Sequence, residues 1–436
     1  MSFARYPAYK DSGVAWLGEV PAHWAVPYGR RVYRQIREPA LASDVQLSAT
    51  QKYGVIPQAD FMEAEDQKVM LALKGLSSFK HVERDDFVIS LRSFQGGIEH
   101  SAYDGCVSPA YTVLRANAAV VPRFIAYTLK SSNYISALQS RTDGIRDGKN
   151  ISYDQFGEIG LPLPPNEEQV AIAAFLDHET AKIDALVAEQ ERLIELLKEK
   201  RQAVISHAVT KGLDPSVPMK DSRVEWLGEV PTHWEIRTLR TLSSVVRGAS
   251  PRPAGDPRFF DGDDTPWVTV GEVTKDTFAY LDSTASCLTK DGAALSRLFR
   301  AGTVIYSNSG ATLGVPKILR INACANDGIV GFEALSDLVD PLFLFQYLDS
   351  LTATIREMVK QGSGQPNLNT DLVKALPISL PSCDEQMAIC SYVEKAIDEY
   401  GALASAAEEA IRLLQERRAA LISAAVTGQI DVREAV

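Results

Sequence analysis

A fifteen-residue segment occurs twice in this chain, and this repetition constrains the architecture more than any other feature of the sequence. Residues 10–24 read KDSGVAWLGEVPAHW and residues 220–234 read KDSRVEWLGEVPTHW, so only three positions differ. Two Trp, a Gly, a Pro and a His in one register do not recur by composition alone. The chain therefore contains a tandem duplication, and its period is far longer than that of a solenoid, which indicates duplicated domains.

A second repeat fixes the order of segments within each copy. Leu163, Pro164, Glu168, Gln169 and Ile172 return 217 residues later as Leu380, Pro381, Glu385, Gln386 and Ile389, whereas the first repeat is shifted by 210. The segment between the two repeats is therefore longer in the second copy, and it shows little residue identity. Each copy consists of a constant lead, a variable body and a constant helix. We predict a first domain with its lead over 1–160, a long helix in 161–213, a second domain with its lead over 214–381, and a second long helix in 382–436.

The formal net charge is −11, which taken alone argues against a nucleic-acid partner. Its distribution changes that interpretation, because the net charge is +1 over 1–160, −3 over 161–213, −4 over 214–381 and −5 over 382–436. The two helical segments carry most of the excess negative charge, so the positive and negative charges of the two bodies nearly balance. A balanced body can still present a local cluster of Arg and Lys to phosphates. The acidic helices suit contact with protein.

The pattern over 166–211 is typical of one long helix. Asn166 is a good N-cap, Pro165 precedes it, and apolar residues then recur at alternating spacings of three and four up to Val209, as in a coiled-coil seam. The second copy runs over 383–426. An antiparallel two-helix coiled coil would bury both stripes; two separate helices, each packed on its own body, are the alternative. Arg201 and Arg418 lie at equivalent positions, where each either pairs with an acid of the opposite helix or stays exposed.

The two bodies are predicted to be mixed α/β globules. In the first, residues 87–89 and 109–114 favour strands and 122–139 favour a helix. In the second, the sequence predicts four strands and a following helix over 341–359. The strands are expected near residues 267–270, 303–307, 315–319 and 329–333.

No catalytic constellation is found in the sequence. His178-Glu179 lacks the second His of a metalloprotease helix, and Gly144 to Lys149 lacks the spacing and hydroxyl of a phosphate-binding loop. The five Cys include no Cys-x-x-Cys, so we expect reduced thiols in a cytoplasmic protein of a bacterium or archaeon. No apolar run approaches the roughly 18 residues of a membrane span. We expect His23 and His233, both in the repeated lead, to make structural hydrogen bonds.

The sequence offers residues suited to binding DNA. Arg and Asn or Gln read guanine and adenine edges with two hydrogen bonds, while Lys, Ser and backbone N–H groups hold phosphates. Such residues cluster beside glycines in both bodies. The DNA-binding candidates are Arg92, Gln95, Arg141, Arg146, Lys149, Asn150, Arg247, Arg252, Arg258, Asn308, Gln365 and Asn367. The candidates for holding the repeated structure together or for docking partners are Trp16, Trp24, Trp226, Trp234, Gln169, Gln386, Arg201 and Arg418.

The repeated lead resembles that of the specificity subunits of type I restriction–modification enzymes. The segment LPLPPNEEQVAIAAFL at 161–176 and the loop GSGQPNL at 362–368 are similar to the same family, and the resemblance covers the whole chain, in order, twice. The second copy departs at Ser382, Cys383 and Asp384, which replace Pro165, Asn166 and Glu167, so the sequence does not identify the N-cap of its helix.

The resemblance implies a non-catalytic subunit in which each body is a target-recognition domain for one half of a bipartite, asymmetric site in double-stranded DNA. It implies that the two helices set the spacing of the half-sites. It also implies two modification (methyltransferase) subunits and restriction or translocase subunits as partners, and no membrane. The chain itself would hold no cofactor or metal; S-adenosylmethionine, ATP and Mg would be bound by the partner subunits.

Two other functions remain open on the residues alone. A coiled-coil scaffold with two protein-binding lobes would account for the duplication without DNA. A stand-alone nuclease or methyltransferase would require a catalytic site that the sequence does not reveal.

Overall fold

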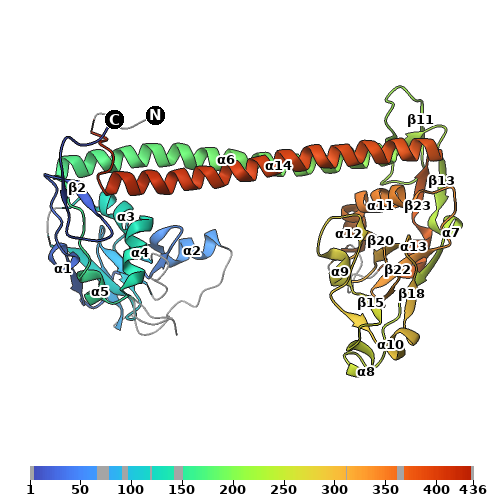
Figure 1. Cartoon of the computed structure of the whole chain (residues 1–436), viewed down its shortest axis with the longest axis horizontal. Helices are drawn as coiled ribbons and strands as arrows, with labels where there is room; N and C mark the ends of the chain where they lie inside the picture. Colours follow the sequence, from blue (N-terminus) through green and yellow to red (C-terminus); the bar gives the residue numbers. More distant parts are fainter. Residues whose placement is uncertain are drawn as a thin grey trace. The chain divides into compact units, whose positions relative to one another are not determined.

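The computed structural model describes residues 4–65, 78–90, 97–117, 120–141, 151–310, 312–360 and 368–433. The chain divides into two compact units (Figure 1). Unit 1 contains residues 1–191 and 408–436, and unit 2 contains residues 192–407. Each unit therefore holds one lead, one body and part of both long helices. Because this division cuts the helices, it does not test the four predicted segment boundaries, which remain a prediction.

Unit 1 begins with the lead, in which β1 (Tyr9–Asp11) pairs with β2 (Glu19–Pro21). Its main sheet has the order β3-β10-β7-β8, and every pairing is antiparallel. These strands are β3 (Tyr33–Ile36), β7 (Phe87–Ile89), β8 (Ile98–His100) and β10 (Thr112–Ala116). Two smaller ladders pair β4 (Leu47–Thr50) with β5 (Gly54–Pro57) and β6 (Lys80–Val82) with β9 (Gly105–Val107). The helices are α1 (Gly29–Val32), α2 (Gln58–Ala64), α3 (Pro122–Lys130), α4 (Ser132–Ser140) and α5 (Tyr153–Gly157).

Unit 2 repeats the lead hairpin with β11 (Met219–Asp221) and β12 (Glu229–Pro231). A five-stranded sheet has the order β14-β22-β19-β20-β16 and a four-stranded sheet the order β17-β15-β21-β18; β13 pairs with β23. The strands are β13 (Glu235–Thr238), β14 (Ser244–Arg247), β15 (Thr265–Val268), β16 (Tyr280–Leu281), β17 (Cys287–Leu288), β18 (Arg297–Phe299), β19 (Val304–Ser307), β20 (Pro316–Leu319), β21 (Ala323–Ala325), β22 (Ile329–Glu333) and β23 (Pro377–Leu380). The helices are α7 (Leu239–Leu242), α8 (Pro257–Phe260), α9 (Val270–Thr274), α10 (Lys290–Ala294), α11 (Pro341–Ser350), α12 (Thr352–Lys360) and α13 (Thr370–Ala375).

The two long helices are α6 (Asn166–Lys211) and α14 (Cys383–Val426), with the limits predicted from the sequence. In unit 1 the beginning of α6 lies beside the end of α14, and in unit 2 the end of α6 lies beside the beginning of α14 (Figure 1). The pairing is therefore antiparallel within each unit. Their apolar stripes join the cores of the bodies through Ile172 and Val426 in unit 1 and through Val209 and Ile389 in unit 2. The expected mixed α/β fold with two paired long helices is confirmed.

Two of the predicted elements differ from the structure in the same way. The helix expected over 122–139 is two helices, α3 and α4, because Ser131 is extended and its hydroxyl caps α4 by accepting from the Tyr134 N–H. The helix expected over 341–359 divides into α11 and α12 at Leu351. The N-cap of α14, which the sequence left open, is Ser382, whose hydroxyl accepts from the Glu385 N–H at 3.3 Å.

Candidate functional site

The second Trp of each lead, Trp24 or Trp234, is buried against the first turn of a long helix. In unit 1, the Trp24 indole donates to Glu168 Oε1 at 2.9 Å, and His23 donates to the other carboxylate oxygen at 2.7 Å. In unit 2, Trp234 and His233 make the same two bonds to Glu385, each at 3.0 Å. One carboxylate thus fastens each lead to its helix. The predicted structural hydrogen bonds of both His residues are confirmed.

The next residue along each helix connects it to the body. The side-chain oxygen of Gln169 accepts from the Val121 N–H at 2.9 Å, where α3 begins, and its amide donates to the Pro164 carbonyl at 2.8 Å. Gln386 repeats this with the Asp340 N–H at 2.8 Å, where α11 begins. Both Gln side chains are buried. Their role in the described structure is therefore to fix the body helix, and any effect on partner docking would be indirect.

Each lead also contacts the end of the other long helix, and we call the contact of a lead with both helices a junction. Gly428, just after α14, has φ of +73° and packs on the first lead, where an added Cβ would overlap Pro21 and lie 3.1 Å from Trp24. Gly212, just after α6, packs on the second lead, and an added Cβ would lie 3.3 Å from Trp234. Each lead is therefore held between the start of one long helix and the end of the other. The start of one long helix and the end of the other can meet at the same lead only if the two helices are antiparallel.

The two equivalent arginines of the long helices behave differently. Arg418 of α14 donates to Asp184 of α6 at 2.8 Å, as expected for a pair between the helices. The position equivalent to Asp184 in the second copy is Gly401, so α14 offers Arg201 no carboxylate there. Among the described contacts of Arg201, the buried Nε has no hydrogen-bond partner. Burial raises the pKa of Asp349 on α11, and the nearby Arg201 partly offsets that shift.

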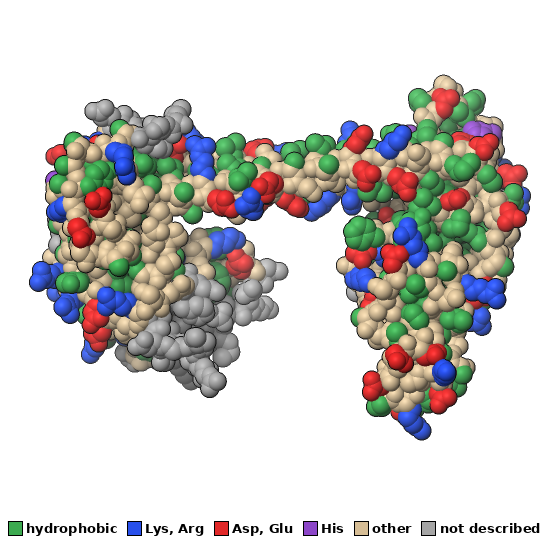
Figure 2. Space-filling model, in the orientation of Figure 1, with side chains coloured by type: hydrophobic (Ala, Val, Ile, Leu, Met, Phe, Trp, Pro, Cys, Tyr) green, Lys and Arg blue, Asp and Glu red, His purple; other side chains and the backbone are tan. Residues whose placement is uncertain are grey.

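The long helices expose large apolar side chains at repeated positions. Three pairs stand 217 residues apart with nearly equal exposure. These are Val170 and Met387 at 55% and 56%, Leu186 and Leu403 at 50% and 54%, and Leu196 and Leu413 at 51% each. Val170, Leu186 and Leu413 belong to unit 1, whereas Met387, Leu403 and Leu196 belong to unit 2. Each unit therefore presents the same set of positions, which we call the apolar triad, and apolar side chains are visible along the helices in Figure 2.

The other repeated Trp residues are only partly buried. Trp16 donates to the Gly160 carbonyl at 3.2 Å and contacts the Tyr134 ring edge-on in unit 1. Trp226 packs against the core of unit 2. Both Trp residues keep part of their surface accessible, so a direct contact with a partner stays a prediction for them.

Three of the DNA-binding candidates of the second body lie around one turn, where Arg247 and Arg252 are exposed and Asn308 is buried. Arg247 at the end of β14 and Arg252 in the loop after it both bond to Asp327, in the turn between β21 and β22. Asn308 joins this turn because its N–H donates to the Gly328 carbonyl at 2.9 Å. The carbonyl of Asn308 accepts from the N–H of Leu368, which follows residues 361–367.

The remaining candidates are separate or outside the described residues. Arg258 on α8 bonds to Asp256 and is not part of the Asp327 cluster. Arg141, at the end of α4, lies 3.4 Å from Glu158. Seven candidates lie outside the described residues, so their placement stays a prediction. These are Arg92, Gln95, Arg146, Lys149, Asn150, Gln365 and Asn367.

Two charged features, one in each body, were not predicted from the sequence. Asp327, which binds two candidate arginines, has no local signal because its partners lie 75 or more residues away. In the first body, four arginines of α1, β3 and the residue after β3 are all exposed: Arg30, Arg31, Arg34 and Arg37. The next acid, Glu38, is already bonded to Arg115. A count of four Arg in eight residues without an acid would have revealed this cluster.

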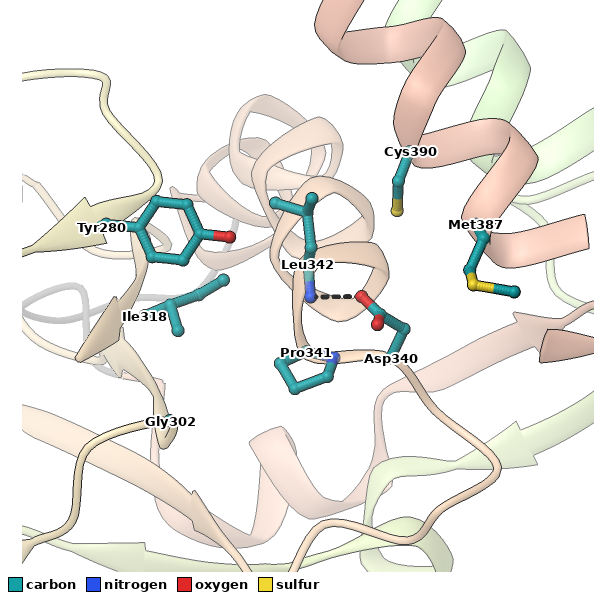
Figure 3. Close-up of a pocket in the computed structure, with 8 residues that line it drawn as sticks. All are labelled: Tyr280, Gly302, Ile318, Asp340, Pro341, Leu342, Met387 and Cys390. Atoms are coloured by element: carbon teal, nitrogen blue, oxygen red, sulfur yellow. Dashed lines mark hydrogen bonds between the residues drawn. The ribbon is translucent and has the colours of Figure 1, made fainter. Parts of the chain in front are cut away.

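Unit 2 contains a cavity of about 410 Å³ between β16, β20, the start of α11 and α14 (Figure 3). Its lining is mostly apolar, with Tyr280, Leu342 and Met387 facing the space. Asp340 is engaged as the N-cap of α11, because it accepts from the Leu342 N–H at 2.8 Å. Burial raises the pKa of the Cys390 thiol to about 12, so the thiol is not a nucleophile at neutral pH.

The described residues include no group of three or more His, Cys, Asp or Glu placed to hold a metal ion. Among the described helices, none is both long and apolar enough to cross a membrane.

Comparison with known proteins points to one family. A family model described as the type I restriction modification DNA specificity domain matches residues 231–410. The chain is 22% identical to a putative type I restriction enzyme MjaX specificity subunit of Methanocaldococcus jannaschii, over 96% of both proteins. It is 23% identical to the type I restriction enzyme EcoKI specificity subunit of Escherichia coli K12, over 81% of this chain and 76% of that protein.

Solved structures show the same fold. A chain from a structure concerned with complex assembly and conformational transition of the type I R-M system superposes with a TM-score of 0.72 at 17% identity, and 93% of this chain and 98% of that chain are covered. The HsdS subunit from Thermoanaerobacter tengcongensis gives a TM-score of 0.55 at 18% identity, over 94% and 98% of the two chains.

Proposed function

We propose that this chain is a type I restriction–modification specificity subunit and that it selects the DNA sequence on which its complex acts. In this proposal the chain is non-catalytic. Each body binds one half of a bipartite, asymmetric site in double-stranded DNA, and the long helices shared by both units set the spacer between the halves.

The observation that carries this proposal is the repeated junction at the base of each body. Trp24 with Glu168 and Trp234 with Glu385 make the same bonds, although the bodies they support share little sequence. A constant frame with two different bodies suits a protein that must recognise two different half-sites in a fixed relation. A subunit with a single binding site would have no use for it.

The charge on the bodies is consistent with DNA as the ligand. Arg247 and Arg252 lie together in unit 2, and the cluster from Arg30 to Arg37 lies in unit 1. Clustered Arg residues supply both phosphate contacts and base-edge contacts, even on a chain whose net charge is negative. Most of the surplus acid is on the segments that contain the long helices, where DNA is not expected to bind.

The apolar triad supports two copies of one partner. Exposed apolar side chains that recur at equivalent positions are typical of a protein-binding surface. Because unit 1 and unit 2 present the same set of positions, a partner that binds one unit would meet a similar surface on the other. We propose two modification subunits at these sites. Restriction subunits would join them, and the partners would bind S-adenosylmethionine, ATP and Mg.

The proposal is tested by mapping DNA modification. The chain is co-expressed with its modification subunit in a host without adenine methylation, and the genome is sequenced by a modification-sensitive method. We expect one split motif with a methylated adenine in each half. The modification subunit expressed alone is the control and should produce no motif. An assembled complex that modifies no motif would favour the scaffold function instead.

A further inference from the structure

The loop after β14 in unit 2 is packed directly on the turn formed by Asn326, Asp327 and Gly328. The Gly248 N–H donates to the Ile329 carbonyl and the Ala249 N–H to the Ala325 carbonyl, both at 2.9 Å. A Cβ at Gly248 would overlap the Asn326 carbonyl, so the two backbones approach as closely as only glycine allows. The arginine that precedes this loop is therefore held at a defined place.

Asp327 bonds to three side chains from this loop region. Its backbone carbonyl accepts from Arg247 Nε at 2.5 Å. Its carboxylate accepts from the Ser250 hydroxyl at 2.8 Å and from Arg252 Nη2 at 3.3 Å. The hydroxyl of Ser250 in turn accepts from the Asp327 N–H at 3.3 Å. One turn residue thus organises the positively charged loop.

Arg247 and Arg252 use different guanidinium nitrogens to bind Asp327. Arg247 is exposed, its Nε is its one hydrogen-bonded atom among the described contacts, and no described carboxylate forms an ion pair with it. Its two terminal nitrogens therefore remain available while the guanidinium is fixed at the Nε edge. Arg252, by contrast, already uses a terminal nitrogen for Asp327.

A guanidinium held in this way matches the edge of guanine. Two parallel N–H groups fit the O6 and N7 acceptors in the major groove, which is the commonest specific contact between proteins and DNA. Holding the side chain beforehand reduces the entropy lost on binding. The Ser250 hydrogen bond, followed by Arg247 and Arg252, keeps the pKa of Asp327 below its usual range, so its carboxylate is charged at neutral pH. That negative charge beside Arg247 disfavours a phosphate and leaves the neutral guanine edge as the better ligand.

We propose that Arg247 reads one guanine of the half-site bound by the second body, and that Asp327 is the positioning residue that holds it. This inference rests on the proposed function and extends it to a base and to one pair of residues.

The test uses the assembled complex of the full chain with its modification subunit, and the methylated motif is mapped by sequencing. Arg247→Lys keeps the charge but loses the two-pronged geometry. We expect it to weaken the preference for G·C at one position of one half-site by about ten- to a hundred-fold, with all other positions unchanged. Arg237→Lys is the matched control, because Arg237 is an exposed arginine of the same body that is already paired with Glu235. It should leave the motif as it is.

The positioning role has its own readout. Asp327→Ala keeps the backbone carbonyl that accepts from Arg247 but removes the carboxylate that binds Ser250 and Arg252. It should therefore weaken the preference at the same base pair by loosening the loop, whereas Asp327→Asn, which can still accept from Ser250, should largely retain it. In the Arg247→Lys background, Asp327→Ala should cause no further loss at that position. Thermal unfolding of each variant complex checks that the fold is kept.

Two outcomes would overturn the inference. One is an unchanged motif in Arg247→Lys. The other is an equal weakening in Arg247→Ala for all sequences, with a shallower salt dependence, which would identify a phosphate contact. Failure of the proposed function is distinguishable, because the unmutated complex would then modify no split motif.

Discussion

The indole of Trp24 donates to Glu168 at 2.9 Å, and 210 residues later the indole of Trp234 donates to Glu385 at 3.0 Å. The two bonds differ in their surroundings, because the Glu168 side chain is 6% exposed and that of Glu385 is 27% exposed. A hydrogen bond to a charged group stabilises more when water competes less for it. The two copies of one junction should therefore differ in strength.

We predict that Glu168→Ala lowers the free energy of unfolding of unit 1 by about 2–3 kcal/mol, because the buried indole N–H of Trp24 loses its acceptor and the half-exposed His23 loses its partner. Glu385→Ala should have a smaller effect on unit 2. Hydrogen exchange of the lead amides, which reports each unit separately, measures both. Equal losses in the two units would contradict the explanation by burial.

Two glycines of the second long-helix region should respond in opposite directions to alanine. Gly401 lies inside α14 with open space at its Cβ position, so Gly401→Ala should stabilise unit 2 by about 0.5–1 kcal/mol. Gly428 has positive φ and no room beside Pro21, so Gly428→Ala should destabilise unit 1 by about 2 kcal/mol or more. Denaturant unfolding of both variants provides the measurement. A gain in stability at Gly428 would refute the packing of the helix end on the lead.

Because Lys317 is buried and paired with Asp276, we expect the free energy of unfolding of unit 2 to depend on pH. Its Nζ bonds to the Asp276 carboxylate at 2.5 Å and to the Phe278 carbonyl, and the side chain is 1% exposed. The hydrogen bond from Lys317 lowers the pKa of Asp276. A depressed carboxyl pKa stabilises the fold above the unfolded value near 3.8 and loses that contribution as the pH falls through the folded value.

We therefore expect the unfolding free energy of unit 2 to fall in acid and this fall to be smaller in Lys317→Met. Asp276→Ala should cost about 3 kcal/mol at neutral pH, because it leaves a buried ammonium without a counter-charge, whereas Lys317→Met should cost much less. Urea unfolding followed from pH 7 to pH 2.5 makes the comparison. Identical acid dependence in the native chain and Lys317→Met would exclude this ion pair as the cause.

The apolar triad predicts separable partner sites. Leu186→Glu in unit 1 should remove one modification subunit, Leu403→Glu in unit 2 should remove the other, and the double variant should bind none. The reason is that a charge buried in an apolar contact is not compensated. The mass of the assembled complex gives the stoichiometry. Glu189→Gln, a polar change at an exposed position on the same long helix as Leu186, is the control and should retain two copies.

Much of the frame could be predicted from the sequence because it depends on local patterns. The limits of α6 and α14 follow from apolar spacing, from proline before the helix and from glycine after it, and the duplicated leads follow from identity alone. The breaks at Ser131 and Leu351 were missed, because continuous apolar spacing does not reveal where a chain must turn to follow the core.

What the sequence by itself determined is the duplication, the two long helices and the α/β character of the bodies. Only the tertiary structure decided which polar groups meet. Arg418 finds Asp184 while its equivalent Arg201 has Gly401 at the corresponding position, and Arg247 finds Asp327 from 80 residues away. The physical reason is that helix limits are set by interactions within a few residues. These polar pairs depend instead on how helices and strands that are distant in the sequence align once the core has formed.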